Sequence, residues 1–297
     1  MEPRIGELAA LFTAFCWTVT AIAFESASRK VGSLSVNIIR LVMAFILLGV
    51  FSWIRRGMFI PLDADAFTWF WLGLSGLVGF VIGDLFLFKA FTVIGSRLSM
   101  LVMTLVPPIT AFIGWLIMGE VLAMIHFAGM ALTLSGIGLV IFNRQSKKQK
   151  NLENVPVKGL LFAIGGAVGQ AVGLVLSKFG MGQFDAFAAT QIRVIAGIAG
   201  FVVIIHFFRR WLAVSTAVQN KKAMGLMLIG ATFGPFLGVS SSLIAVQNTA
   251  TGIASTIMAI TPILIIPPTY FFFKQQVSWK EVIGALVSVI GVALFFM

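Results

Sequence analysis

Long apolar runs separated by short polar turns follow one another along almost the entire chain. Each run is close to the roughly 20 residues that a helix needs to cross a bilayer core of about 30 Å. The segments of alternating apolar and polar residues that membrane β-barrels require are absent, so backbone hydrogen bonds must close within helices. The pattern predicts ten membrane-spanning helices, at about residues 8–24, 34–54, 67–90, 97–118, 123–142, 159–178, 184–208, 223–246, 252–273 and 280–296.

The chain also contains an internal duplication. Five positions of the first half return 155 residues later with identical or similar side chains: Gly79, Gly83, Ser96, Pro107 and Glu120 return as Gly234, Gly238, Thr251, Pro262 and Gln275. A repeat of this length indicates two fused domains rather than a solenoid. We assign a first five-helix repeat to residues 5–143, a basic linker loop to 144–158 and a second five-helix repeat to 159–297.

The number of helices in each repeat determines how the two repeats are oriented. Because five is odd, the second repeat enters the membrane from the side opposite to the first. The predicted fold class is therefore an all-α integral membrane protein of ten helices, arranged as two inverted five-helix repeats. Secondary transporters with inverted repeats bind their substrate near the bilayer midplane, where the two repeats meet.

Composition supports a lipid environment. Hydrophobic residues make up 59% of the chain, charged residues only 10%, and the mean hydropathy is +1.05. Soluble domains carry about 25% charged residues, so this chain lacks the polar surface that water requires. We expect a multi-pass protein of the cell membrane, with the lipid bilayer as its surroundings and a monomer as a plausible state.

The formal charge of +11 raises the question of nucleic-acid binding. The basic residues, however, lie in short loops between apolar runs, as the positive-inside rule predicts, so no nucleic-acid partner is expected. Most of the 21 lysines and arginines follow odd-numbered helices, which places both termini outside the cell by the same rule. The single cysteine, Cys16, excludes an internal disulfide framework.

Two tandem five-helix copies with a proline in each fourth helix resemble the EamA-type repeat of the drug/metabolite transporter superfamily. The pair Gly119-Glu120 and the following helix with Gly129 and Gly136 match the same pattern, and the similarity covers about residues 7–142 and 159–296. The second copy departs from it, with Lys274-Gln275 in place of Gly-Glu. The resemblance implies secondary active transport of small polar metabolites, amino acids or similar, by alternating access and with efflux as the direction. It also implies cytoplasmic termini, in conflict with the charge distribution.

Asp84 is the most informative single residue, because a carboxylate deep within an apolar span usually faces a cavity or a cationic partner. It could couple transport to protons or bind a substrate ammonium group, or it could form a structural pair with Lys89 or Arg40. Arg40 and Arg193 are equivalent in the two repeats. They could neutralise a substrate carboxylate or pair with Asp84, although their position near helix ends favours snorkelling toward the headgroups.

Other polar residues interrupt otherwise apolar spans. We expect a central cavity to be lined by several of them, in particular Trp17, Thr20, Gln170 and Gln247. Pro107 and Pro262 remove backbone donors at equivalent positions and are candidate hinges. Small residues at four-residue spacing predict close helix crossings; they form the ladders Ser75/Gly79/Gly83, Gly165/Gly169/Gly173 and Gly230/Gly234/Gly238.

The sequence gives no indication of an enzyme. It contains no metal-binding cluster, no phosphate-binding loop and no activated nucleophile, so no catalytic residue, metal or cofactor is expected. Glu120, at the end of the fourth span, is interpreted as a structural carboxylate paired with a nearby base. Two alternatives to a metabolite transporter remain open. One is a flippase or scramblase for a lipid-linked substrate, and the other is a membrane-embedded enzyme, which would need clustered acids that this chain lacks.

Overall fold

A computed structural model describes residues 4–148, 156–264 and 279–294, and in these ranges the chain is helical without strands. The helices of the first half are α1 (Ile5–Val31), α2 (Ser33–Arg56), α3 (Ala66–Gly76), the π-helical segment η1 (Leu77–Gly83), α4 (Asp84–Val102), the short 3₁₀ segment η2 (Met103–Leu105), α5 (Val106–Met118) and α6 (Met124–Lys148). Those of the second half are α7 (Val157–Met181), α8 (Ala186–Phe207), α9 (Trp211–Gln219), α10 (Lys221–Ala231), the π-helical segment η4 (Thr232–Val239), α11 (Ser240–Asn248), α12 (Thr251–Met258), α13 (Thr261–Leu264) and α15 (Trp279–Ala293).

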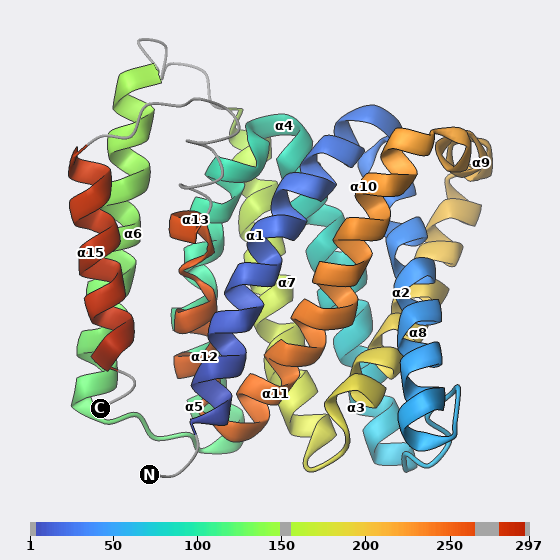
Figure 1. Ribbon diagram of the computed structural model, residues 1–297, viewed down its shortest axis with the longest axis horizontal. Helices are drawn as coiled ribbons and strands as arrows, with labels where there is room; N and C mark the ends of the chain where they lie inside the picture. The colour runs from blue at the N-terminus through green and yellow to red at the C-terminus, as the bar shows by residue number, and fades with distance from the viewer. Residues whose placement is uncertain (1–3, 149–155, 265–278, 295–297) are drawn as a thin grey trace.

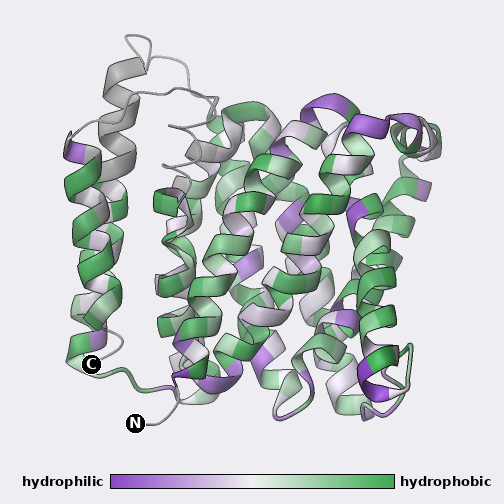
Figure 2. Cartoon of the chain, viewed as in Figure 1, coloured by the Kyte–Doolittle hydropathy of each residue, from purple (hydrophilic) through white to green (hydrophobic). Residues whose placement is uncertain are grey.

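Six continuous helical stretches are long and apolar enough to cross a membrane; they cover Ile5–Val31, Ser33–Arg56, Ala66–Ser96, Val157–Met181, Ala186–Phe207 and Lys221–Asn248. The other four predicted spans overlap shorter apolar helices within Met103–Met118, Met124–Leu139, Thr251–Leu264 and Val282–Ala293; residues 265–273 and 295–296 of the last two spans lie outside the described residues. Hydrophobic residues cover most of the helix surface, and hydrophilic residues gather mainly toward the two ends of the bundle (Figure 2).

Local sequence explains where several helices begin and end. The Asp65 side chain accepts a hydrogen bond from the Thr68 backbone at the start of α3, and Asn220 accepts one from Ala223 at the start of α10. Asp65 and Asn220 are 155 residues apart, so the duplication preserves this N-cap as well. At the other end, α2 stops at Gly57, whose φ of 73° is accessible to glycine at no steric cost.

The same pairing of helices occurs twice. Helix α1 packs along α10, η4 and α11, and α7 packs in the same way along α3, η1 and α4 (Figure 1). Helix α2 lies against α8, and α5 lies against α12. Each of these contacts joins the first half of the chain to the second, so neither half forms a separate core.

Glycines allow the backbones of α7 and η1 to touch. A Cβ atom added to Gly169 would lie 2.6 Å from the Gly83 Cα, and one added to Gly173 would lie 2.9 Å from the Gly79 Cα. The predicted close crossing is therefore confirmed. The third ladder packs differently, because Gly230 faces the ring of Phe24 on α1.

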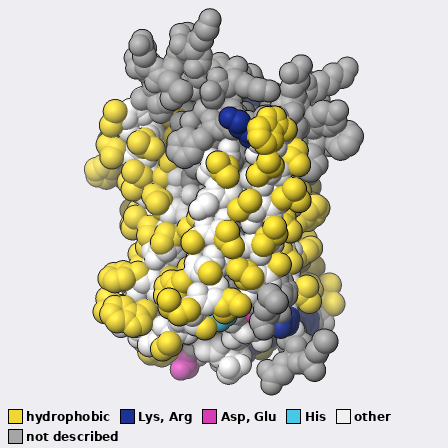
Figure 3. Space-filling view, turned by 90° about the vertical axis from the view of Figure 1, so that its left-hand side faces the viewer, with side chains coloured by type: hydrophobic (Ala, Val, Ile, Leu, Met, Phe, Trp, Pro, Cys, Tyr) yellow, Lys and Arg dark blue, Asp and Glu magenta, His cyan; other side chains and the backbone are white. Residues whose placement is uncertain are grey.

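Helices α6 and α15 form a pair at one side of the bundle (Figure 1). The Ser288 hydroxyl donates to the Thr133 carbonyl oxygen at 3.0 Å, and a Cβ at Gly136 would clash with the same hydroxyl. Seen from this side, the surface carries hydrophobic side chains over most of its height (Figure 3), as expected for helices in contact with lipid.

Candidate functional site

A central cavity lies between the two halves of the chain, and about 120 Å³ of it is open to the centres of water-sized molecules. The halves contribute different parts of its lining. From the first half come α1, α2, η1, α4, η2 and the start of α5; from the second come α7, α8, η4, α11, α12 and α13. Trp17, Thr20, Arg40, Asp84, Gln170, Arg193 and Pro262 all line this cavity.

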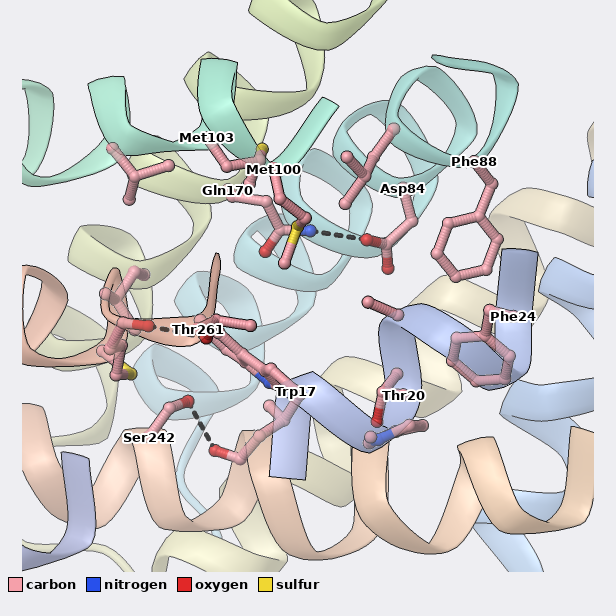
Figure 4. A pocket seen from close by; sticks show the side chains of 18 of the residues that line it. Trp17, Thr20, Phe24, Asp84, Phe88, Met100, Met103, Gln170, Ser242 and Thr261 are labelled. Carbon is pink, nitrogen blue, oxygen red and sulfur yellow. Dashed lines mark hydrogen bonds between the residues drawn. The ribbon is translucent and has the colours of Figure 1, made fainter. Parts of the chain in front are cut away.

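Asp84 stands at the centre of a buried polar network. Its Oδ1 accepts a hydrogen bond of 2.6 Å from Gln170 Nε2, and its Oδ2 forms an ion pair with Arg40 (Figure 4 shows the bond to Gln170). Behind the pair, Asn37 accepts from Arg40 Nε at 3.1 Å and donates to the Asp84 carbonyl oxygen at 3.4 Å. The carboxylate is thus held by helices from both halves of the chain, α2 and α7.

Arg40 does not snorkel to the headgroups. It is 3% exposed, and its guanidinium lies over the rings of Phe88, Phe24 and Phe80 at 4.7, 5.3 and 5.7 Å from their centroids. The snorkelling prediction is therefore wrong. The ion pair with Asp84, combined with cation–π contacts in a desolvated site, outweighs the reach of the side chain toward the interface.

Arg193 is buried to the same extent, at 3% exposure, so the snorkelling prediction is wrong for this residue too. Its guanidinium lies 4.9 Å from the Phe80 ring centroid, but its Nε atom has no hydrogen-bond partner. Two glycines of the third span make room for it: a Cβ at Gly79 would lie 3.1 Å from its Nη2, and one at Gly76 would lie 2.3 Å from its carbonyl oxygen. Its position thus depends on close contact between α8 and the α3–η1 stretch.

The remainder of the cavity is largely apolar. Phe24, Phe88, Met100 and Met103 surround the polar network (Figure 4). The Thr20 hydroxyl lines the cavity but already donates to the Cys16 carbonyl oxygen of its own helix at 2.9 Å. The site thus combines one charged side with an apolar side.

Gln247 lies outside the cavity, contrary to the prediction. Its Nε2 donates to the carbonyl oxygens of Gly182 and Phe184, at 2.8 and 3.1 Å, in the turn between α7 and α8. The amide satisfies backbone acceptors that the turn leaves without partners, which is a common way to pair such groups.

The model of the EamA-like transporter family matches residues 4–142 and again residues 157–297. The chain belongs to the EamA-like transporter family. It is also similar to a protein of known crystal structure, with 18% sequence identity and a TM-score of 0.70 over 98% of this chain and 95% of that one. At this identity the likeness supports the fold alone. None of the curated proteins compared with the chain matches it.

Within this EamA-like transporter, the candidate hinge prolines begin helices rather than interrupt them. Pro107 lies in the first turn of α5, directly after η2, and Pro262 lies in the first turn of α13, after the break that follows Met258. A proline costs no backbone hydrogen bond at the start of a helix. Pro262 lines the cavity, whereas Pro107 is buried beside it. Whether either acts as a hinge stays a prediction.

Two features of this family member escaped sequence reasoning. The π-helical segments η1 and η4 occupy equivalent positions in the two repeats, and both line the cavity through residues such as Phe80 and Pro235. Such segments occur frequently at functional sites. Pro235 inside an apolar run was the available signal.

Carboxylates from two non-equivalent positions also cap equivalent helix starts. Glu120 Oε2 accepts from the Thr251 backbone N–H and hydroxyl, at 2.9 and 2.7 Å, while its Oε1 pairs with Lys178 Nζ at 2.7 Å. The predicted pairing of Glu120 with a base is confirmed. Glu25 accepts in the same way from the backbone N–H and hydroxyl of Ser96, the equivalent of Thr251. Gln275, the equivalent of Glu120, lies outside the described residues.

Gly95, with a φ of 80°, breaks the helix within α4, so Ser96 begins a new helical stretch. This start lies at the end of the bundle where α1 ends, and the start of α12 lies at the opposite end (Figure 1). Each joins helices from different parts of the chain: Glu25 of α1 to Ser96 of α4, and Glu120, which follows α5, to Thr251 of α12 and Lys178 of α7. We call them the Glu25 latch and the Glu120 latch. The central cavity lies between them along the helix axes.

Proposed function

We propose that this EamA-like transporter is a secondary active transporter that moves small polar metabolites, amino acids or similar, across the cell membrane. The observation that carries the proposal is the central cavity, because both halves of the chain line it and its buried charges come from α2, α4 and α8. Ionisable residues inside a membrane are costly and typically mark a substrate or ion pathway.

The proposed architecture is ten spans in two inverted five-helix repeats. The repeated pairing of α1 with α10–η4–α11 and of α7 with α3–η1–α4 supports it, as does the match of the family model to each half. Inverted repeats allow the cavity to open first to one side and then to the other. Separate latches at the two ends of the bundle are consistent with such alternating access, with efflux as the proposed direction.

Asp84 is the proposed site of proton coupling. Its carboxylate joins Arg40 of α2 to Gln170 of α7, so its protonation would weaken a contact between the two halves of the chain. Asp84 is the acidic residue among the described residues that line the cavity. Proton coupling through another carboxylate would therefore need an acid that lies outside the cavity.

Transport by proteoliposomes tests the proposal. Uptake of a pooled set of radiolabelled amino acids, their 2-oxo acids and nucleosides is measured with and without an imposed pH gradient, for the wild type and for Asp84→Asn. We expect accumulation that requires the gradient in the wild type, and exchange without accumulation in the variant. Asp63→Asn, which removes an exposed carboxylate outside the cavity, is the matched control.

Two results would contradict parts of this proposal. Transport that ignores the gradient and is unchanged in Asp84→Asn would make the protein a facilitator with a structural Asp84. Absence of transport for every pooled solute would refute metabolite transport and favour a lipid-linked substrate.

A further inference from the structure

The charges of the cavity are unequal. Among the described residues that line it, Arg40 and Arg193 are cationic and Asp84 is anionic, which leaves an excess of one positive charge. All three side chains are at least nine-tenths buried. An uncompensated charge in such surroundings is costly, so the site favours a ligand that supplies the missing negative charge.

Among the described residues of the cavity, Arg193 is the cation without a direct ion pair, although the charge of Asp84 also acts on it. Asp84 uses one carboxylate oxygen for Arg40 and the other for Gln170. Arg40 in turn has Asn37 as the acceptor for its Nε. The Arg193 Nε, in contrast, is buried without a hydrogen-bond partner while the side chain lines the cavity. A carboxylate accepts hydrogen bonds from two guanidinium nitrogens at once, so a bound carboxylate could satisfy this donor as well as balance the charge.

The same arrangement disfavours a substrate amine. Each oxygen of Asp84 already accepts a hydrogen bond, one of them within the ion pair with Arg40, so a substrate ammonium would compete with Arg40 for this carboxylate. It would also add a positive charge to a cavity that already has an excess. A zwitterionic amino acid would thus gain binding free energy at its carboxylate and lose it at its ammonium group.

The size and the apolar side of the cavity define the rest of the ligand. Aromatic and thioether side chains, including Phe24, Phe88, Met100 and Met103, lie around the polar network (Figure 4). The centres of water-sized molecules can occupy about 120 Å³ of the cavity, well above the roughly 10–15 Å³ that one water fills, so the space holds more than a single water. This space suits a compact molecule with an apolar body.

We infer that the substrate class is small organic monocarboxylates with an apolar body and no amino group, bound through Arg193. This inference rests on the proposed function and narrows its substrate class. In this arrangement Arg193 binds the carboxylate and the apolar side formed by Phe24, Phe88, Met100 and Met103 contacts the body of the ligand. The Asp84–Arg40 pair does not contact the ligand, so Asp84 remains available for the proposed proton coupling.

Ligand binding to the detergent-solubilised full-length protein tests the inference through thermal stabilisation, because a ligand that binds the folded state raises the melting temperature. The probes are two matched pairs, phenylpyruvate with phenylalanine and 4-methyl-2-oxopentanoate with leucine, each differing in an oxo group in place of the amine. We expect at least one 2-oxo acid to bind about tenfold more tightly than its amino acid, a difference of about 1.4 kcal/mol.

Variants of Arg193 locate the binding site. Arg193→Gln is expected to weaken 2-oxo acid binding about tenfold or more, and Arg193→Lys, which keeps the charge but loses the bidentate geometry, to weaken it less. Arg55→Gln removes an arginine that is half exposed and lies outside the cavity, and is expected to leave binding unchanged. If Arg193→Gln does not fold, Arg193→Lys still distinguishes the readings, because equal binding in that variant and the wild type would overturn the bidentate contact.

Other outcomes separate this inference from the proposed function. Equal or tighter binding of both amino acids, or undiminished 2-oxo acid binding in Arg193→Gln, would overturn the inferred substrate class. In that case, transport of amino acids or nucleosides in the pooled assay would leave the transporter proposal standing. Arg193-dependent binding of a 2-oxo acid that proteoliposomes do not move would support the site and refute transport.

Discussion

Replacement of Gly169 by alanine is a direct test of the packing that supports the site. The new methyl group would lie 2.6 Å from the Gly83 Cα and 2.9 Å from the Gly83 nitrogen, both backbone atoms of the opposing segment. Carbon atoms pack at about 3.5–4.0 Å, so α7 and η1 must separate locally by roughly 0.9 Å or more. No flexible side chain at this contact can move aside instead.

The expected cost follows from two opposing terms. Overpacking of this kind typically costs about 1–3 kcal/mol. Alanine recovers up to about 1 kcal/mol relative to glycine in a helix interior, a value measured in water. When the full gain applies, the net expectation for Gly169→Ala is a loss of roughly 0–2 kcal/mol in the free energy of unfolding, and about 1–3 kcal/mol relative to a glycine-to-alanine change that has the same gain and no clash. Gln170 is the next residue, so the separation also lengthens its 2.6 Å hydrogen bond to Asp84.

Reversible unfolding in mixed detergent micelles, followed by the fluorescence of the seven tryptophans, measures this loss. Gly225→Ala is the matched control, because Gly225 lies in α10 with no atom within 4 Å of the added methyl group. It is expected to leave the free energy of unfolding unchanged or raise it slightly. An equal effect of both substitutions, or stabilisation by Gly169→Ala, would refute the reasoning from backbone contact.

Three further predictions concern charged groups. Arg40→Gln leaves the buried Asp84 carboxylate without its ion-pair partner and should lower the free energy of unfolding by about 3–5 kcal/mol, measured by the same unfolding assay. Glu120→Gln removes the charge that pairs with Lys178 but keeps an acceptor for the helix start, and should cost about 1–2 kcal/mol. Hydrogen bonds from the first turn of α3 hold the pKa of Asp65 below its ordinary value of 3.8. The contribution of Asp65 to the free energy of unfolding is therefore complete above the ordinary pKa and is lost as the pH falls through the lower folded value. Asp65→Ala should flatten the acid limb of the stability–pH curve.

Exposed ion pairs provide controls for these predictions. Arg55→Gln, which breaks the pair with Asp185, and Asp63→Asn, which breaks the pair with Arg56, should each change the free energy of unfolding by less than about 1 kcal/mol. Losses at these surface pairs as large as that of Arg40→Gln would contradict the role of burial. A stability–pH curve with the same acid limb in Asp65→Ala and the wild type would contradict the role of the N-cap.

The sequence predicts those parts of the fold that depend on local patterns. Apolar length locates the helices, and small residues at four-residue spacing locate the crossing of α7 with η1. The depth of Asp84 within an apolar run indicates a cavity because few other positions satisfy a buried carboxylate. The short, mostly exposed helix α9 does not stand out from its loop in a hydropathy pattern, and it was not predicted.

The errors concern information that a single sequence does not carry. Position along a helix gives the depth of Arg40 and Arg193 but not the neighbour that each side chain meets, so their burial depends on Phe80 and Asp84 from other helices. The amide of Gln247 could line the cavity or bind a backbone turn equally well, and the position of the α7–α8 turn decides which partner it has. Long-range packing determines these cases.

The Glu25 latch and the Glu120 latch show how the two repeats have diverged since the duplication. A single ancestral repeat that paired with a copy of itself would have the same carboxylate contact in both copies. After duplication each copy is free to drift, and it has done so: the partner of Glu120 is Lys178, whereas Glu25 occupies the position equivalent to Lys178 and pairs with Arg29. The contacts at the two ends of the bundle are therefore unequal, and substitutions at Glu25 or Glu120 would change the stability of one end without touching a residue that lines the cavity.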